Sequence, residues 1–159
     1  METNLKTLFS VLNNEDADNE KLLNENVLYL AFVGDAIFDC ISRNYIVKHY
    51  HDKLKIVDIH KKNTKIVCAS SQSKIIDYLI DNKLVDENDI NIFKHGRNAH
   101  NSSRSKNSNI VDYRKATGFE VLLGYLFFDN KIDKMINLAT KGIKYILDNN
   151  NNEILTMQV

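Results

Sequence analysis

The 159-residue chain contains no proline and only five glycines, the two residues on which most tight turns depend. A β-sandwich or β-barrel needs many such turns, because each pair of neighbouring strands is joined by one. Their scarcity favours long helices joined by polar loops rich in asparagine, aspartate and serine. The sequence therefore predicts an all-α protein, a bundle of about seven helices.

Membrane segments and metal-binding cysteine motifs are also missing. No apolar run approaches the roughly 20 residues of a transmembrane helix, and the N-terminal "METNLKTLFS" lacks the basic and apolar blocks of a secretory signal. Cys40 and Cys68 have no metal-ligand spacing, so we expect buried, free thiols in a reducing compartment. These absences predict a cytoplasmic protein that does not enter a membrane.

The formal net charge is zero, which argues against a uniformly cationic surface for nucleic acid. The charge is nevertheless segregated, because residues 94–115 contain six basic side chains and a single acid, Asp112. The basic residues are Lys94, Arg97, Arg104, Lys106, Arg114 and Lys115. Residues 96–112 lack an apolar period and are predicted to form a loop. Long loops inside compact domains are often functional.

Apolar periodicity and capping residues indicate where the helices lie. A short amphipathic segment over about 4–12 is followed by an acidic, asparagine-rich loop. A long helix over about 26–49 starts at Asn24 or Asn26, and its first half is apolar on all sides, as in a buried helix. The remaining helices are predicted over about 55–69, over 72–82 with Ser70 or Ser71 as the cap, from Asp86 to about 95, and over 113–129 and 131–148. We expect one domain over residues 1–159, with its core in about 24–148.

Two of the apolar helices each contain an unexpected carboxylate. Asp35 lies within "LAFVGDAIFD" at residues 30–39, with Asp39 one helical turn later, and Glu120 lies within "TGFEVLLGYLFFD" at residues 117–129. A lone acid in a helix most often faces solvent or pairs with lysine or arginine. A buried carboxylate without a compensating cation, by contrast, is costly. The placement of these acids therefore suggests a site in which a cation is bound.

Glycines near these acids permit a close helix–helix approach: Gly34 in the first helix, and Gly118 and Gly124 in the second. If the two helices pack together, Asp35 and Glu120 approach each other and repel unless a divalent cation lies between them. Oxygen ligands suit Mg²⁺ or Mn²⁺, which can activate a water molecule for attack on a phosphate ester.

These segments, taken in order, resemble the ribonuclease III catalytic domain, and the chain as a whole is similar to its short form, Mini-ribonuclease III. The resemblance covers about residues 24–140 and includes "VCASSQSK" at 67–74, "HGRNA" at 95–99 and "YRKATGFEVLLGYLF" at 113–127. It implies a ribonuclease III-type catalytic domain without a double-stranded-RNA-binding domain. It further implies a homodimer that cleaves double-stranded RNA with Mg²⁺, for which Mn²⁺ can substitute, in the maturation of 23S ribosomal RNA. A ribosomal protein is a candidate helper.

The resemblance places Asp35 and Glu120 on the family's catalytic, metal-binding acids. Two other positions depart from the larger family, because Ala31 and Thr117 stand where standard ribonuclease III has a glutamate and an aspartate. The number of metal ions and the groups that complete the shell therefore stay open. Asp39 and Thr117 are candidates for outer positions around the metal. Because two of the family's usual acids are absent, one alternative stays open, a ribonuclease III-like dimer that binds structured RNA without cutting it.

A metal phosphohydrolase of the HD type is a second alternative, based on the pair His51–Asp52. Its further ligands are lacking, because His60, His95 and His100 are not convincingly placed for that role.

Double-stranded RNA is recognised mainly through its phosphates and 2′-hydroxyls. The candidate RNA-binding residues are Arg97, Asn98, Arg104 and Lys106. A structural role competes with this interpretation, because Gly96 can end a helix and Asn98 can form a turn. The candidates for the dimer interface are Phe32, Ile37, Phe38 and Ile41, for which a place in the core of the same chain is the alternative.

Overall fold

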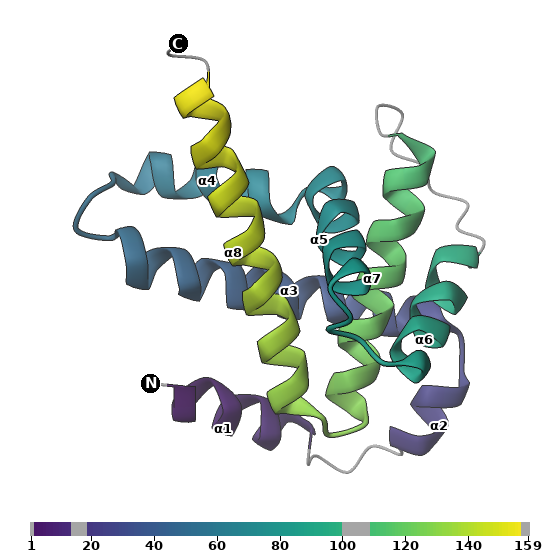
Figure 1. Ribbon diagram of the computed structural model, residues 1–159. Coiled ribbons are helices and arrows are strands. Elements are labelled where there is room, and N and C mark those ends of the chain that lie inside the picture. Colours follow the sequence, from purple (N-terminus) through teal and green to yellow (C-terminus); the bar gives the residue numbers. More distant parts are fainter. Residues whose placement is uncertain (1, 14–18, 100–108, 157–159) are drawn as a thin grey trace.

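The computed structural model describes residues 2–13, 19–99 and 109–156, and these residues form helices and no strand (Figure 1). The elements are α1 (Glu2–Asn13), α2 (Asn19–Asn24), α3 (Val27–Tyr50), α4 (Ile56–Val67), α5 (Ala69–Asp81), α6 (Glu87–Asn98), α7 (Ile110–Phe128) and α8 (Ile132–Thr156). The all-α prediction is confirmed, with eight helices in the described part of the chain against the seven expected.

Helices α3 and α7 cross in direct backbone contact near the middle of the bundle (Figure 1). A Cβ atom on Gly34 of α3 would overlap the carbonyl oxygen of Glu120, and one on Gly124 of α7 would overlap that of Leu30. The close approach expected at these two glycines is confirmed. Because Asp35 directly follows Gly34, the crossing itself brings Asp35 to the part of α7 that carries Glu120.

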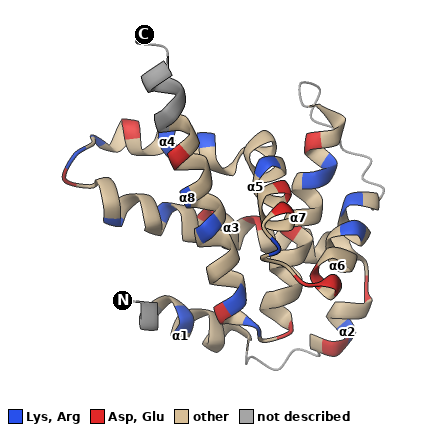
Figure 2. Ribbon diagram, viewed as in Figure 1, with Lys and Arg blue, Asp and Glu red and all other residues tan. Residues whose placement is uncertain are grey.

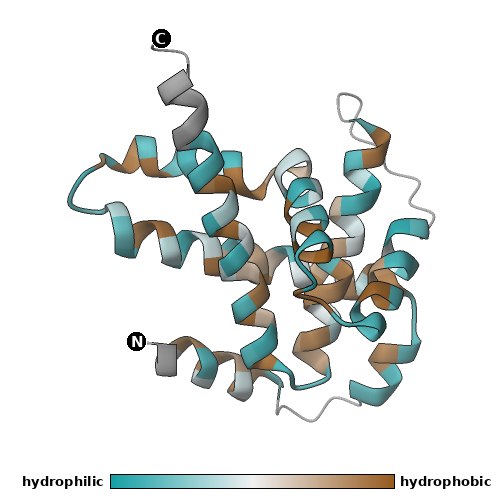
Figure 3. Cartoon of the chain, in the orientation of Figure 1, coloured by the Kyte–Doolittle hydropathy of each residue, from teal (hydrophilic) through white to brown (hydrophobic). Residues whose placement is uncertain are grey.

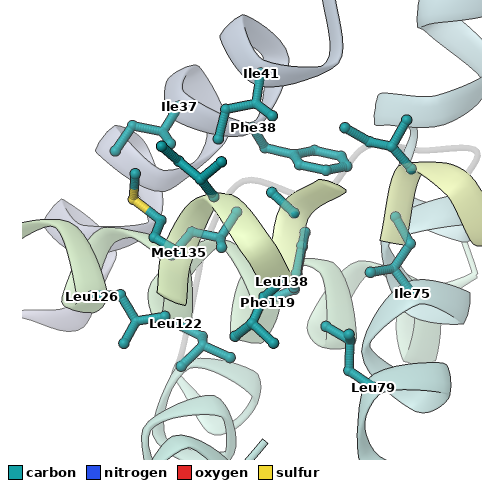
Figure 4. Packing of buried hydrophobic residues seen from close by; sticks show 14 of the residues in the cluster. Ile37, Phe38, Ile41, Ile75, Leu79, Phe119, Leu122, Leu126, Met135 and Leu138 are labelled. Carbon is teal, nitrogen blue, oxygen red and sulfur yellow. The ribbon is translucent and has the colours of Figure 1, made fainter. Parts of the chain in front are cut away.

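The core surrounds this crossing. Phe38 of α3 and Phe119 of α7 are fully buried, and their rings meet edge to face with centroids 5.1 Å apart. Side chains of α5 and α8 close the core, as Figure 4 shows for Ile75, Leu79, Met135 and Leu138. Hydrophobic residues gather where α3, α7 and α8 pack (Figure 3). Among the described residues, no helix combines the length and the apolar character that a membrane crossing requires.

Helix α6 packs along α7 through a second pair of glycines. Its N-terminus has the predicted cap, since Asp86 accepts from the backbone N–H of Asp89 and Asp89 accepts from that of Asp86. Gly96 does not end the helix, which was the structural role considered for it, but is buried within α6 against Val121 and Gly118 of α7. The predicted loop over 96–112 is therefore wrong at both ends, because α6 continues to Asn98 and α7 begins at Ile110.

Three other predictions are corrected. Helix α2 was not predicted, and its first two residues belong to the segment expected to be an asparagine-rich loop. Helix α5 begins at Ala69, before the predicted caps, and the Ser71 hydroxyl donates to the carbonyl of Lys65 instead. Cys40 and Cys68 are exposed free thiols rather than buried ones, since both lie away from the core.

Candidate active site

Asp35 and Glu120 line one cavity of about 320 Å³. Its walls come from α3, from the junction of α4 and α5, and from the first half of α7. The lining residues are Leu28, Ala31, Phe32, Asp35, Val67, Ala69, Gln72, Tyr113, Ala116, Thr117 and Glu120. We predicted from the sequence that the two acids approach each other if their helices pack together. The helices do pack together, and both acids line the same cavity.

The two acids differ in burial. Glu120 is half-buried in the cavity, whereas Asp35 is exposed at its rim. Burial first, and the negative charge of Asp35 second, raise the pKa of Glu120 to about 8, although a side-chain hydrogen bond with Gln72 opposes the rise. Partial burial and the charge of Asp39 raise the pKa of Asp35.

The electrostatics of the cavity fit a cation. Within the described part of the chain, no lysine or arginine forms an ion pair with Asp35 or Glu120. Two carboxylates that line one cavity without a positive partner, where the charge of Asp35 raises the pKa of Glu120, are in an arrangement that a divalent metal stabilises. Their oxygen atoms are ligands that Mg²⁺ and Mn²⁺ accept. The residues present therefore fit such an ion.

The described residues contain no cluster of three or more His, Cys, Asp or Glu side chains placed to hold a metal. The Asp39 carboxylate accepts hydrogen bonds from Arg43 Nε and from Asn63 Nδ2, each at 2.7 Å. Asn63 in turn accepts from the Ser42 hydroxyl at 2.7 Å, so this network ties α4 to α3. The Asp39 carboxylate therefore makes structural hydrogen bonds, and Asp39 is not among the residues that line the cavity.

Ala31 and Thr117, the positions that lack the larger family's acids, both lie in the cavity wall. The Thr117 hydroxyl donates to the carbonyl of Tyr113 at 3.1 Å, one turn earlier in the same helix. That bond satisfies its proton and leaves the oxygen lone pairs beside the cavity. Thr117, a candidate for an outer position around the metal, thus lies in the cavity wall with a hydroxyl oxygen. Ala31 contributes only a methyl group.

Gln72 is a polar cavity residue for which we predicted no role from the sequence. It is 2% exposed and sits in the first turn of α5, and its Nε2 donates to the Val67 carbonyl at 2.9 Å. Its Oε1 is buried and has no hydrogen-bond partner among the described residues. The only sequence signal was its place within "VCASSQSK", which carried the family resemblance as a whole and gave no reason to single out the glutamine.

The candidate RNA-binding residues are only partly covered by the structure. Arg97 and Asn98 occupy the last turn of α6, where the Arg97 guanidinium lies 5.7 Å from the ring centroid of Phe93 and donates to Asn98 Oδ1. Arg104 and Lys106 lie outside the described residues. Figure 2 marks basic residues in blue on the ribbon at the end of α6 and near the start of α7. One of them, Lys115, is ion-paired with Asp77 of α5 at 2.8 Å.

Comparison with known proteins places this geometry in a family. The sequence pattern of the Ribonuclease III domain matches residues 28–131. The chain is 34% identical to the Mini-ribonuclease 3 of Clostridium tetani over 87% of its own length and 90% of that protein. It is 32% identical to the Mini-ribonuclease 3 of Staphylococcus aureus over 85% of its length and 98% of that protein.

A solved structure agrees with the sequence relatives. The crystal structure of a Fusobacterium nucleatum protein superposes with a TM-score of 0.59 at 29% identity, covering 75% of this chain and 94% of that one. The matched pattern contains both helices of the crossing, and with them Asp35 and Glu120. The chain therefore belongs to the ribonuclease III family and is an endoribonuclease of the ribonuclease III type.

Proposed function

We propose that the protein is a Mg²⁺-dependent endoribonuclease that cleaves double-stranded RNA in the maturation of 23S ribosomal RNA. The observation that carries the proposal is the cavity that Asp35 and Glu120 both line without a basic partner among the described residues. Similarity to proteins named Mini-ribonuclease 3 over nearly their whole length supports it. We further propose that residues 1–159 act as a single catalytic domain.

Asp35 and Glu120 are the proposed metal ligands, with Mn²⁺ as an alternative to Mg²⁺. When bound, the ion would supply Lewis-acid stabilisation of the scissile phosphate and lower the pKa of a water molecule that attacks it. Glu120 is held rigidly because its helix crosses α3 in backbone contact, whereas Asp35 at the rim is accessible to solvent and substrate. Thr117, in the wall, is the proposed outer-position residue, and Asp39 acts on the site only through its charge on Asp35.

The basic segment that joins α6 to α7 is the proposed contact with RNA phosphates. Arg97 and Asn98 end α6, and the chain returns at α7, whose first turns contain Tyr113 of the cavity wall. Arg104 and Lys106 lie between these points in the sequence. A basic segment that leads into the wall of the proposed cleavage site is suitably placed to hold the duplex backbone.

A homodimer is proposed because one site cuts one strand, whereas two sites related by a two-fold axis address both strands of a duplex. Of the four candidate interface residues, Phe32 is 82% exposed and also lines the rim of the cavity. Ile37, Phe38 and Ile41 are buried in the core of their own chain, so an interface role for them is wrong. The proposed interface therefore centres on Phe32.

A small catalytic domain offers few contacts to RNA, so we propose that a ribosomal protein bound to the precursor helps to present the substrate. The proposed cytoplasmic location follows from that substrate, because precursor ribosomal RNA is processed where ribosomes assemble.

The test of the function compares wild-type protein with Asp35→Asn on a duplex-forming precursor of 23S ribosomal RNA. Wild type with Mg²⁺ should cut the RNA at defined positions, and the variant should bind it without cutting, because the substitution keeps the shape of the side chain and removes its charge. An uncut precursor with wild-type protein, Mg²⁺ and a demonstrated RNA complex would favour the alternative of an RNA-binding dimer that does not cleave.

A further inference from the structure

The cavity contains one polar atom whose role is not explained by the two acids. Gln72 Oε1 is buried and lacks a hydrogen-bond partner among the described residues, and no other buried side-chain nitrogen or oxygen atom there is left without one. Buried acceptors in folded proteins are nearly always satisfied, so each exception requires an explanation. The side chain lines the cavity that Asp35 and Glu120 share.

The orientation of the Gln72 amide is fixed by its neighbours. Its Nε2 group donates to the Val67 carbonyl at 2.9 Å, and a side-chain hydrogen bond links the same residue to the Glu120 carboxylate. Exchanging the amide nitrogen and oxygen would place Oε1 against the Val67 carbonyl, where two acceptors repel. The oxygen is consequently the free end of a side chain that already contacts one proposed metal ligand.

We propose that Gln72 supplies a neutral oxygen to the metal shell formed with Asp35 and Glu120, in place of the carboxylates that Ala31 and Thr117 lack. This inference rests on the proposed function and adds a residue to its site. Carbonyl and carboxylate oxygens are the ligand types that suit Mg²⁺ and Mn²⁺.

Charge balance accounts for a neutral group at this position. Asp35 and Glu120 together carry two negative charges, which match one divalent cation. Burial already disfavours the charged form of Glu120, and a further carboxylate in the same wall would add to that cost. An amide oxygen adds a ligand atom or water acceptor without adding charge. The same side chain is also hydrogen-bonded to Glu120, which is the arrangement by which residues around a metal orient its ligands.

The test measures Mn²⁺ binding by the full-length protein, using electron paramagnetic resonance of free Mn²⁺, in the absence of RNA. Gln72→Leu removes the oxygen at similar volume and should weaken Mn²⁺ binding by about tenfold or more. Gln72→Glu keeps the oxygen, adds a charge toward the ion and should tighten binding. Ser73→Ala, a neighbouring buried polar residue of α5 outside the cavity lining, is the matched control and should bind as wild type does.

Each outcome decides a separate point. Unchanged Mn²⁺ affinity in both Gln72 variants, with circular dichroism like that of wild type, would overturn the inference and leave Gln72 a structural residue. If Gln72→Leu fails to fold, Gln72→Glu still decides, because affinity equal to or weaker than wild type refutes the proposal. Asp35→Asn distinguishes a failure of the Gln72 inference from a failure of the proposed metal site. Loss of Mn²⁺ binding in that variant alone keeps the proposed function, whereas a wild-type protein that does not bind Mn²⁺ contradicts the metal site itself.

Discussion

Replacing Gly34 by alanine tests the crossing on which the whole site depends. Helix propensity alone predicts that Gly34→Ala stabilises α3 by about 1 kcal/mol. The structure predicts the opposite sign, because the new Cβ would overlap the Glu120 carbonyl oxygen and crowd the Gly124 nitrogen. These are backbone atoms of a buried helix, which cannot rotate away as a side chain does, so α3 and α7 must separate.

The size of the effect follows from the same geometry. Overpacking a core costs about 1–3 kcal/mol, and a backbone collision belongs at the upper end of that range. After the gain of about 1 kcal/mol from helix propensity, we expect a net loss of about 2 kcal/mol in the free energy of unfolding. For a chain of this size, that corresponds to a fall of about 4–8 °C in Tm.

Urea and thermal unfolding followed by circular dichroism measure this loss. Ala36→Gly, two residues further along α3 at an exposed position, is the matched control and should lose only about 1 kcal/mol, the value of propensity alone. A Gly34→Ala protein as stable as wild type, or more stable, would refute the close crossing. In the folded fraction, the separation of the helices should also lower the pKa of Glu120, because the charge of Asp35 moves away.

Three further predictions concern the charge, the RNA and the dimer. Without a divalent cation, the free energy of unfolding should fall as pH rises from 4.5 to about 8, because the folded protein retains the Glu120 proton that the unfolded chain releases. Urea unfolding across this pH range should show the fall in wild type but not in Glu120→Gln. Arg97→Ala should weaken RNA binding and reduce the slope of log K for RNA binding against log salt concentration by about 1. The control Lys115→Ala, in which the lost charge is already ion-paired with Asp77, should change this slope less. Equal slopes in wild type and Arg97→Ala would contradict a phosphate contact. In analytical ultracentrifugation, Phe32→Ser should shift the protein from dimer toward monomer. The control Val57→Ser on α4, where the valine is 59% exposed, should leave the dimer unchanged. A dimer that persists in both variants would place the interface elsewhere.

Much of the local structure could be predicted from the sequence because its determinants are local. The Asn26 side chain accepts from the Leu28 N–H and starts α3 within the predicted range, and Asp86 begins α6 through a capping box. Helix α2 and the start of α5 were missed, since a six-residue helix shows no period and Cys68 is not a typical cap.

The sequence by itself determined that the protein is helical, that Asp35 and Glu120 are anomalous in apolar helices, and which family the chain resembles. Helical period and composition are properties of neighbouring residues, so they can be read without coordinates. Only the tertiary structure decided that the two acids share a cavity, that Asp35 lies at its rim and that Asp39 is bound to Arg43 and Asn63. It alone revealed the unpartnered oxygen of Gln72, because satisfaction of a buried acceptor depends on groups far apart in the chain that only packing brings together.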